Sequence, residues 1–369
     1  MTDTEVAAAA LVSLPALSPA RLRHALRDHD AHGLWGDVLA GRPTIREFLS
    51  AEDSQRATVD AAGVNLDELR RTLNAASIRV HIVSDDDYPK ALKDDPGRPP
   101  VLFTRGDVSL LRRRVVAIVG TRRATAAGRA TATELAEELA TVGITVLSGL
   151  ALGIDTAAHR GAMTNGSTVA VVGCGLDRCY PARHQVIFDE ICDQHLALSE
   201  WPPGTTPAPF RFPMRNRLIA ALSEVVVVVE SGLTGGSLIT AREALNRGRE
   251  VMAVPGSPRV AASSGTNALI RDGATPVTSV EDVLCEFGLG GGASRSPHPI
   301  PPSKGRAVEV VHELSQGSLT LDQLVHRLVA PIGEVVVAVG ELLRLQIITE
   351  SNGWLELSSS MLVSGKEHQ

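Results

Sequence analysis

The chain has 369 residues and a formal net charge of −6, and 44% of its residues are hydrophobic while 3% are aromatic. This length predicts two or three domains with a large core, and the acidic balance argues against a surface coated with positive charge for nucleic acid. The four cysteines form no CxxC pair, so we expect reduced buried thiols, no metal and no cofactor in a soluble, cytoplasmic protein. The apolar N-terminal stretch is too short and too interrupted by proline to span a membrane.

Residues 1–75 have leucines at near-helical spacing, with breaks at Pro15 and Pro19. Two short helices joined by a tight turn fit this pattern, as in a SAM or helix-hairpin-helix domain. The glycines with which a helix-hairpin-helix turn contacts phosphate are missing. We therefore interpret this region as a small helical domain for packing or partner contact.

Residues 76–286 begin with extended pieces and then alternate strand and helix patterns. Strands are predicted at 115–119, 144–147, 168–172, 196–199, 225–229 and 251–254, with helices between them, among them 126–139 and 238–247. Repeated strand-helix units of this kind predict an α/β fold, an extended Rossmann-like doubly wound parallel sheet. The run of valines at 225–229 fits a central strand buried on both faces.

The last part of the chain begins with a Gly-, Ser- and Pro-rich linker at 287–305. Residues 306–369 then predict three helices, at 307–314, 321–328 and 334–345, followed by a hairpin turning at Asn352-Gly353. This is the element set of a winged helix. Its third helix offers Glu334, Glu341 and one arginine, which favours partner contact or packing over the reading of DNA bases.

The buried strand at 115–119 ends in a turn that carries four candidate site residues, Gly120, Thr121, Arg122 and Arg123. Open α/β sheets bind their ligands at the carboxyl ends of their strands. The helix predicted at 126–139 would direct its positive amino end to the same place. A hydroxyl, two guanidiniums and a helix dipole together favour an anion, above all a phosphate.

Further glycines follow the other predicted strands. Gly149 and Gly173 allow close approach of the backbone, and Gly235, Gly236 and Ser237 at a helix start offer free N–H groups to an anion. Asp155 and His159 share one helix face, either for acid–base work or, as we favour, as a cap and a hydrogen-bonded structural histidine.

One stretch interleaves basic and aromatic residues near the predicted amino end of a short helix. Its candidate site residues are Arg211, Phe212, Arg215, Asn216 and Arg217, and no acidic residue lies between Trp201 and Ser223. Arginine binds phosphate bidentately and phenylalanine stacks on any base, so the stretch predicts a groove for single-stranded nucleic acid. The alternative is that the arginines form structural ion pairs and the ring lies in the core.

A second basic run lies between Arg112 and Arg129, with six arginines and no acid. We expect both runs to reach one edge of the sheet, where the glycine turns meet. The nucleotide-binding and hydrolase motifs fail in this chain. There is no P-loop, Arg178 replaces the third glycine of a dinucleotide fingerprint, and no nucleophile or metalloprotease motif occurs. The sequence therefore predicts no catalytic residue.

Taken together, these motifs resemble the DNA-processing protein A family, also called Smf. The resemblance covers about residues 80–285. The segments that carry it are Val116–Arg122, Ser148–His159, Gly173–Asp177, Tyr180-Pro181, Ser199-Glu200, Phe212–Arg217, Gly236–Ala241, Ala253–Gly256 and Gly265–Ile270.

The resemblance implies a core that binds single-stranded DNA, protects incoming DNA and loads RecA recombinase onto it in natural transformation, and that forms a homodimer. It implies that Arg122 holds phosphate, that Phe212 stacks on a base and that Arg215 and Arg217 line the pocket. The segment around Asn267 and Ile270 resembles one used for self-association.

Two positions depart from the family pattern. Pro209 stands three residues before the stacking phenylalanine, where many members have lysine, and Ser231-Gly232-Leu233 replaces a lysine-bearing turn. Arg211 is a candidate substitute; otherwise a lower affinity is expected.

The main alternative is an enzyme on a related Rossmann-like fold, a phosphoribohydrolase that cleaves a nucleoside monophosphate. Such proteins also use a Gly-Gly-Ser/Thr helix start, and Glu243 is the candidate acid. The outlying arginines favour a strand over a free nucleotide. A transcriptional regulator that binds DNA through residues 306–369 is a third interpretation.

Overall fold

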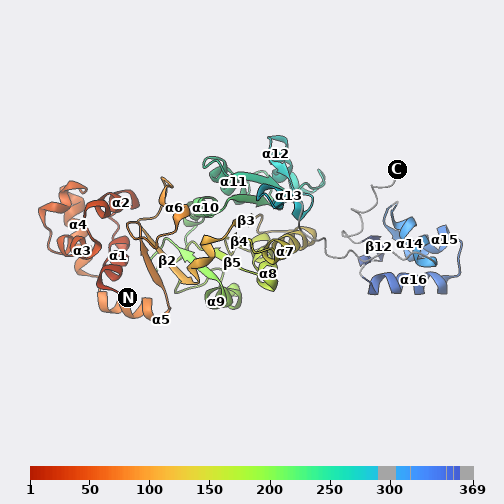
Figure 1. The fold of residues 1–369 in the computed structure, drawn as a ribbon, viewed down its shortest axis with the longest axis horizontal. Coiled ribbons are helices and arrows are strands. Elements are labelled where there is room, and N and C mark those ends of the chain that lie inside the picture. Colours follow the sequence, from red (N-terminus) through yellow and green to blue (C-terminus); the bar gives the residue numbers. More distant parts are fainter. Residues whose placement is uncertain (290–304, 316, 346, 352, 358–369) are drawn as a thin grey trace. The chain divides into compact units, whose positions relative to one another are not determined.

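The computed structural model describes residues 1–289, 305–315, 317–345, 347–351 and 353–357 (Figure 1). The chain divides into two compact units, Met1–Gly292 and Ala293–Gln369. Within the described residues, no helix is both long and apolar enough to cross a membrane. Cys174 and Cys192 are buried and Cys179 is half-buried, but Cys285 is exposed, so the expectation of buried thiols fails for that one.

The first unit is built on a nine-stranded sheet in the order β1-β2-β6-β5-β4-β3-β7-β8-β9. Its strands are β1 (Arg79–Ile82), β2 (Val101–Gly106), β3 (Val115–Val119), β4 (Thr145–Ser148), β5 (Thr168–Val171), β6 (Leu196–Ser199), β7 (Val225–Val228), β8 (Glu250–Ala253) and β9 (Thr275–Pro276). The strands from β6 to β9 pair in parallel, and β2 and β1 add an antiparallel edge.

The strand order of the sheet reverses between β3 and β7. After β3 the chain adds β4, β5 and β6 on one side, then returns to place β7, β8 and β9 on the other. Loops leaving β3 and β7 therefore diverge and leave a crevice at the carboxyl ends of these strands. The doubly wound parallel sheet predicted from the sequence is confirmed, with each predicted strand within a residue of its observed bounds.

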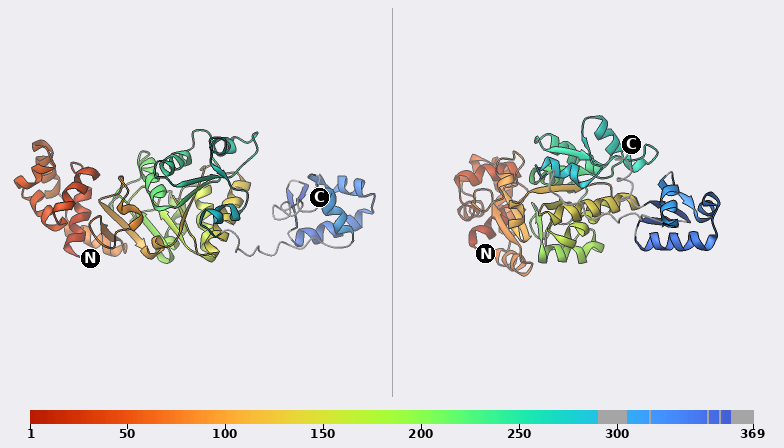
Figure 2. Two further views of the ribbon diagram at one scale, coloured as in Figure 1. Left: turned by 45° about the horizontal axis from the view of Figure 1, so that its top comes forward. Right: turned by 45° about the vertical axis from the view of Figure 1, so that its right-hand side comes forward.

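Helices cover both faces of this sheet (Figures 1 and 2). They are α6 (Lys90–Lys93), α7 (Ala126–Thr141), α8 (Ile154–Asn165), α9 (Gln185–Gln194), α10 (Arg211–Leu222), α11 (Gly236–Leu245), α12 (Ser264–Arg271) and α13 (Val280–Glu286), with short 3₁₀ turns at Val108–Arg112, Ala182–His184 and Ala261–Ser263. Alternate residues of the strands face opposite hydrophobic clusters, because side chains on a strand alternate between its two faces. Neighbouring Val169 and Ala170 illustrate this division.

The N-terminal region contains five helices rather than the expected two, because the leucine pattern at residues 11–26 covers only the first two; Pro19 opens the second of these, which Ser18 caps. They are α1 (Asp3–Ser13), α2 (Pro19–Asp28), α3 (Ala31–Leu39), α4 (Ala51–Ala62) and α5 (Leu66–Ala75), with a 3₁₀ turn at Pro43–Glu47. Val6 to Leu11 of α1 are fully buried. One hydrophobic cluster joins these helices to β1, β2 and α9, so residue 75 does not separate two cores.

The second unit contains α14 (Arg306–Ser315), α15 (Leu321–Leu328) and α16 (Ile332–Arg344). Its sheet has the order β10-β12-β11, from β10 (Leu319–Thr320), β11 (Ile348–Ser351) and β12 (Trp354–Leu357). The three predicted helices and the hairpin are present, whereas Asn352 of the predicted turn and most of the predicted linker lie outside the described residues. The winged-helix assignment stays a prediction.

Candidate nucleic-acid interface

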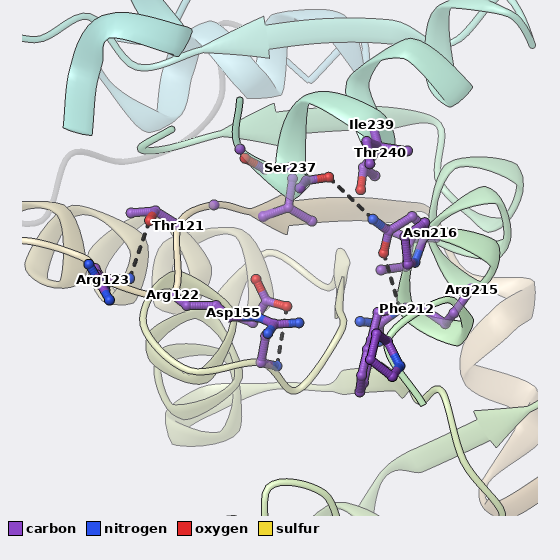
Figure 3. Close-up of a pocket in the computed structure, with 18 of the residues that line it drawn as sticks. Thr121, Arg122, Arg123, Asp155, Phe212, Arg215, Asn216, Ser237, Ile239 and Thr240 are labelled. Atoms are coloured by element: carbon purple, nitrogen blue, oxygen red, sulfur yellow. Dashed lines mark hydrogen bonds between the residues drawn. The ribbon is translucent and has the colours of Figure 1, made fainter. Parts of the chain in front are cut away.

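A pocket of about 560 Å³ opens where the loops after β3 and β7 meet α10 (Figure 3). Of the predicted site residues, those that line it are Gly120, Thr121, Arg122, Arg123, Phe212, Arg215, Asn216, Gly235, Gly236 and Ser237. Thr121 and Arg122 follow β3, and the Arg122 side chain extends towards Phe212 and Asn216 of α10 (Figure 3). The sheet therefore brings together residues as far apart in sequence as Gly120 and Ser237, at the strand ends where ligands bind α/β sheets.

An aromatic and cationic stack forms one wall of the pocket. The Arg122 guanidinium lies 5.2 Å from the centre of the Phe212 ring. The Tyr180 ring lies 5.4 Å from Phe212 at an interplanar angle of 33°. Arg122 is exposed, and no carboxylate pairs with it in the described part of the chain. This wall offers π-faces to a base and an unpaired positive charge to a phosphate.

Tyr180 was not among the predicted site residues. Tyr180-Pro181 is one of the segments that resemble the family, but a single tyrosine before a proline does not by itself indicate a binding site. The Tyr180 ring is 44% exposed, so it remains accessible beside Phe212. Gly173 lies against the Phe212 ring. A Cβ at this position would be 3.2 Å from the ring, so the glycine leaves room for it.

Arg215 lies deeper and serves the framework as well as the pocket. Its buried guanidinium donates hydrogen bonds to the carbonyl oxygens of Gly149, at 2.7 Å, and Val171. Burial lowers the pKa of Arg215 to about 10, although Asp155 opposes this shift. A Cβ on Gly149 would lie 2.6 Å from the guanidinium, so a larger residue there would displace the Arg215 side chain. Gly149 lines a small cavity beside the pocket together with Arg122 and Phe212.

Asp155 and His159 hold the turn between β4 and α8. The Asp155 carboxylate accepts the N–H groups of Gly149 and Ala151, at 3.1 and 3.3 Å; burial raises its pKa, and Arg215 opposes this shift. His159 is fully buried between Thr168 and the N–H of Leu150. Burial lowers its pKa to about 3, with Arg215 adding to the shift. This geometry supports a structural role for both residues rather than acid–base work. The expectation that Asp155 caps the helix is wrong, because Gly153 is the cap of α8 and Asp155 lies within the helix.

Of the two helix amino ends expected at the site, the one at α7 is already occupied. The Glu230 carboxylate accepts the N–H of Thr125 at 2.9 Å and its hydroxyl at 2.5 Å. Gly128 makes this possible, because a Cβ there would lie 2.2 Å from the Glu230 carboxyl carbon. The expectation that α7 directs its dipole at the ligand is therefore wrong, since a carboxylate already neutralises it.

The amino end of α11 is open to the pocket. Gly235 caps it without a side-chain hydrogen bond, and the first N–H groups of a helix have no partner within the helix. Asn216 donates to the carbonyl oxygen of Gly236 at 3.2 Å, which joins α10 to this turn. The Ser237 hydroxyl donates to Ser231 at 2.9 Å. The anion cradle predicted at 235–237 is thus accessible beside Arg122.

Arg217 does not converge on the pocket. Its guanidinium pairs with the buried Glu200 carboxylate and donates to the carbonyl oxygen of Gly97. The helix explains this difference: α10 already begins at Arg211, with Pro213 tolerated in its first turn. Arg215 to Arg217 therefore lie in mid-helix, and Arg217 lies about 140° around the axis from Phe212.

Arg211 also lies outside the pocket. Its guanidinium is 4.8 Å from the Trp201 ring and 5.2 Å from the Phe210 ring, and it donates to the carbonyl oxygen of Thr206. Arg211 therefore does not replace the lysine that many family members have at position 209. Pro209, which stands there in this chain, lines the pocket but carries no charge. The second missing lysine belongs to the turn at residues 231–233. Leu233 of this turn is exposed and adds no charge.

The basic run between Arg112 and Arg129 is divided by β3. Arg112 to Arg114 precede the strand, and Arg122 and Arg123 follow it. Five strand residues separate the two groups by about 16 Å. Arg114 pairs with Glu224 at 2.7 Å and lies 4.8 Å from the Phe287 ring. The expectation that the whole run reaches one edge of the sheet is therefore wrong.

The residues proposed for other roles also have partners within the chain. Asn267 on α12 bonds both backbone groups of Gly256, at 2.9 and 3.1 Å, and so holds the loop after β8. Self-association through Asn267 and Ile270 stays a prediction. Glu243, the candidate acid of the alternative enzyme, pairs with Arg247 and does not line the pocket.

The fold and the site define a Rossmann-like α/β protein with a basic, aromatic-lined pocket at the reversal point of its sheet. The family model of DNA recombination-mediator protein A matches residues 79–288, and the chain belongs to this family. The resemblance drawn from the sequence motifs is thereby confirmed.

Curated relatives share much of this chain. DNA processing protein DprA of Streptococcus pneumoniae is 44% identical over 206 residues, which are 56% of this chain and 73% of that protein. Protein Smf of Escherichia coli is 41% identical over 215 residues, 57% of this chain and 58% of that protein.

Two solved structures are similar to this one. The X-ray structure of DprA from S. pneumoniae aligns with a TM-score of 0.67 and 34% identity, over 78% of this chain and 98% of that chain. A structure of DNA processing protein A from Helicobacter pylori, solved to explain how that protein binds single-stranded DNA, aligns with a TM-score of 0.52 and 33% identity, over 57% of this chain and 97% of that chain.

Proposed function

We propose that the pocket binds single-stranded DNA and that the protein acts in DNA recombination as a binding protein rather than an enzyme. The observation that carries this proposal is the Arg122–Phe212–Tyr180 stack beside the open amino end of α11. The single-stranded DNA binding of the related H. pylori protein supports the same ligand.

The pocket offers separate contacts to the two parts of a nucleotide. An unpaired base stacks on Phe212 and Tyr180, a contact that tolerates every sequence because all bases have π-faces. The adjoining phosphate is bound by Arg122 and by the N–H groups at 236–237. Duplex DNA keeps its bases stacked on one another, so it cannot use the aromatic wall in this way.

The finer parts of the proposal come from family membership. We propose that the bound strand is incoming DNA in natural transformation, that the protein protects it in the cytoplasm and loads RecA recombinase onto it, and that two copies associate through the Rossmann-like core. A RecA filament assay on protein-coated single strands tests the loading step. Faster filament growth with the protein than without it is expected.

The direct test compares three ligands at several salt concentrations by fluorescence anisotropy: a single strand, its duplex and a mononucleotide. The single strand should bind most tightly. The logarithm of its affinity should fall with the logarithm of salt by about 0.7 for each phosphate contact. Equal affinity for the mononucleotide, or stronger binding of the duplex, would contradict the proposal.

The phosphoribohydrolase alternative is tested in the same preparation by release of free base from AMP. The separation of Glu243 from the pocket leaves that reaction without its candidate acid. No release is therefore expected, and robust turnover would replace the binding proposal with an enzymatic one.

A further inference from the structure

A second group of arginines lies on the far side of α10 from Phe212. Arg23 of α2 donates a hydrogen bond to the carbonyl oxygen of Arg98 at 2.8 Å, and Arg98 donates to that of Asp95 at 3.0 Å. Arg27 follows Arg23 by one helical turn and is exposed. We call Arg23, Arg27 and Arg98 the α2 basic cluster.

The three guanidiniums of the α2 basic cluster form no ion pair with a described residue, although Arg23 lies near enough to the Glu200 carboxylate to oppose, with Arg217, the rise that burial causes in the pKa of Glu200. No carboxylate pairs with them in the described part of the chain, whereas the neighbouring acids are already used. Glu200 pairs with Arg217, and Asp95 pairs with Arg247 at 2.6 Å. Burial lowers the pKa of Arg23, and the nearby charges of Arg98 and Arg217 lower it further. Mutual repulsion of this kind is relieved by an anion.

The α2 basic cluster lies at the same edge of the sheet as the pocket. Strand β2 runs antiparallel to β6, with Phe103 opposite Ser199, so the start of β2 lies at the carboxyl end of β6. Arg98 stands three residues before β2 and is therefore held at this edge. Figure 1 shows α2, α6 and α10 following one another beside the sheet.

The separation of the two sites suits a polymeric anion. The order β2-β6-β5-β4-β3 puts four strand spacings between the start of β2 and the end of β3, which lie at the same edge of the sheet. At about 4.8 Å each, this is about 19 Å along the edge. A single nucleotide is too short for such a distance, but a strand of several nucleotides has phosphates at both points.

We propose that the α2 basic cluster is a second phosphate-binding site, which holds the DNA strand where it leaves the pocket towards the N-terminal helices. This inference rests on the proposed function of the pocket and adds the path of the strand. It also gives the N-terminal helical region a part in DNA binding, through charge rather than through the glycine turn of a helix-hairpin-helix.

The experiment uses the full chain with a 5′-phosphorylated dinucleotide and a single strand of about 12 nucleotides. The dinucleotide reaches only the pocket, whereas the longer strand reaches both sites. Arg98→Ala removes one guanidinium of the cluster. Arg27→Glu is a second variant that breaks no hydrogen bond or ion pair, because Arg27 is exposed and bonds to no described residue. Arg112→Glu, an exposed arginine at the opposite edge, is the matched control.

Each cluster variant should weaken binding of the longer strand about fivefold at about 0.1 M salt and lower its salt slope by about 0.7. Binding of the dinucleotide should not change, and Arg112→Glu should change neither. Arg122→Ala should weaken both ligands, and if it weakens neither, the pocket proposal itself fails.

The inference is overturned if both cluster variants keep the affinity and salt slope of the longer strand while Arg122→Ala weakens it. That result would show that the bound strand does not contact the α2 basic cluster. A longer strand that binds no more tightly than the dinucleotide would also overturn it.

Discussion

The two ends of β3 carry arginines from one basic run, but these arginines have different environments. Arg122, after the strand, faces Phe212 and pairs with no carboxylate in the described part of the chain. Arg114, before the strand, forms an ion pair with Glu224 at the amino ends of β3 and β7. Arg217 resembles Arg114 in being paired, although its neighbours on α10 line the pocket. The comparison teaches that the partner of an arginine, rather than the local density of charge, decides whether it can bind a ligand.

The largest effect is expected on stability, from Arg217→Ala. Removing this guanidinium leaves the buried Glu200 carboxylate without its ion pair, which costs about 3 to 5 kcal/mol in the free energy of unfolding. Urea denaturation measures this loss. Arg114→Ala is the matched control, because its exposed pair with Glu224 should change stability by at most about 1 kcal/mol. Full stability of Arg217→Ala together with lost DNA binding would instead make Arg217 a ligand contact.

The next effect is a dependence of stability on pH from His159. This histidine stays neutral in the folded chain down to about pH 3, whereas an unfolded histidine takes up a proton near pH 6.5. Between these values the unfolded state binds more protons, so stability falls as the pH falls. The expected loss is about 2 kcal/mol at about pH 5. His159→Gln should flatten the pH dependence by this amount, and an unchanged slope would contradict the assignment.

Phe212→Leu tests the aromatic wall. Loss of base stacking should weaken single-strand binding by about 2 kcal/mol, or about thirtyfold, while the fold is retained. Phe210→Leu is the matched control, since Phe210 is exposed two residues earlier on the chain but does not line the pocket. Equal losses in both variants, measured by fluorescence anisotropy, would show that the pocket is not the stacking site.

The smallest effect is expected for Arg122→Ala. Loss of one phosphate contact should weaken single-strand binding about fivefold at about 0.1 M salt and lower the salt slope by about 0.7. Arg113→Ala, at the other end of β3, should leave both values unchanged. If Arg122→Ala and Arg113→Ala change the affinity and the salt slope equally, the end of β3 at which an arginine lies does not decide whether it binds DNA.

The sequence determined much of the fold and one half of the site. Buried β-branched runs fixed β3 and β7 as central strands, because only a strand covered on both faces tolerates five consecutive apolar residues. The glycines after those strands marked the turns that line the pocket. Arg122 was identified from its place after a buried strand, and Phe212 from a stretch that interleaves basic and aromatic residues.

Only the tertiary structure decided which charges remain available. Arg217 and the amino end of α7 each meet a carboxylate, Glu200 and Glu230, that follows a distant strand. The partner of a side chain depends on helix phase and sheet order, and small errors in either move a residue to the opposite face. The α2 basic cluster depends on the same kind of information, because it joins Arg23 and Arg98, which are 75 positions apart.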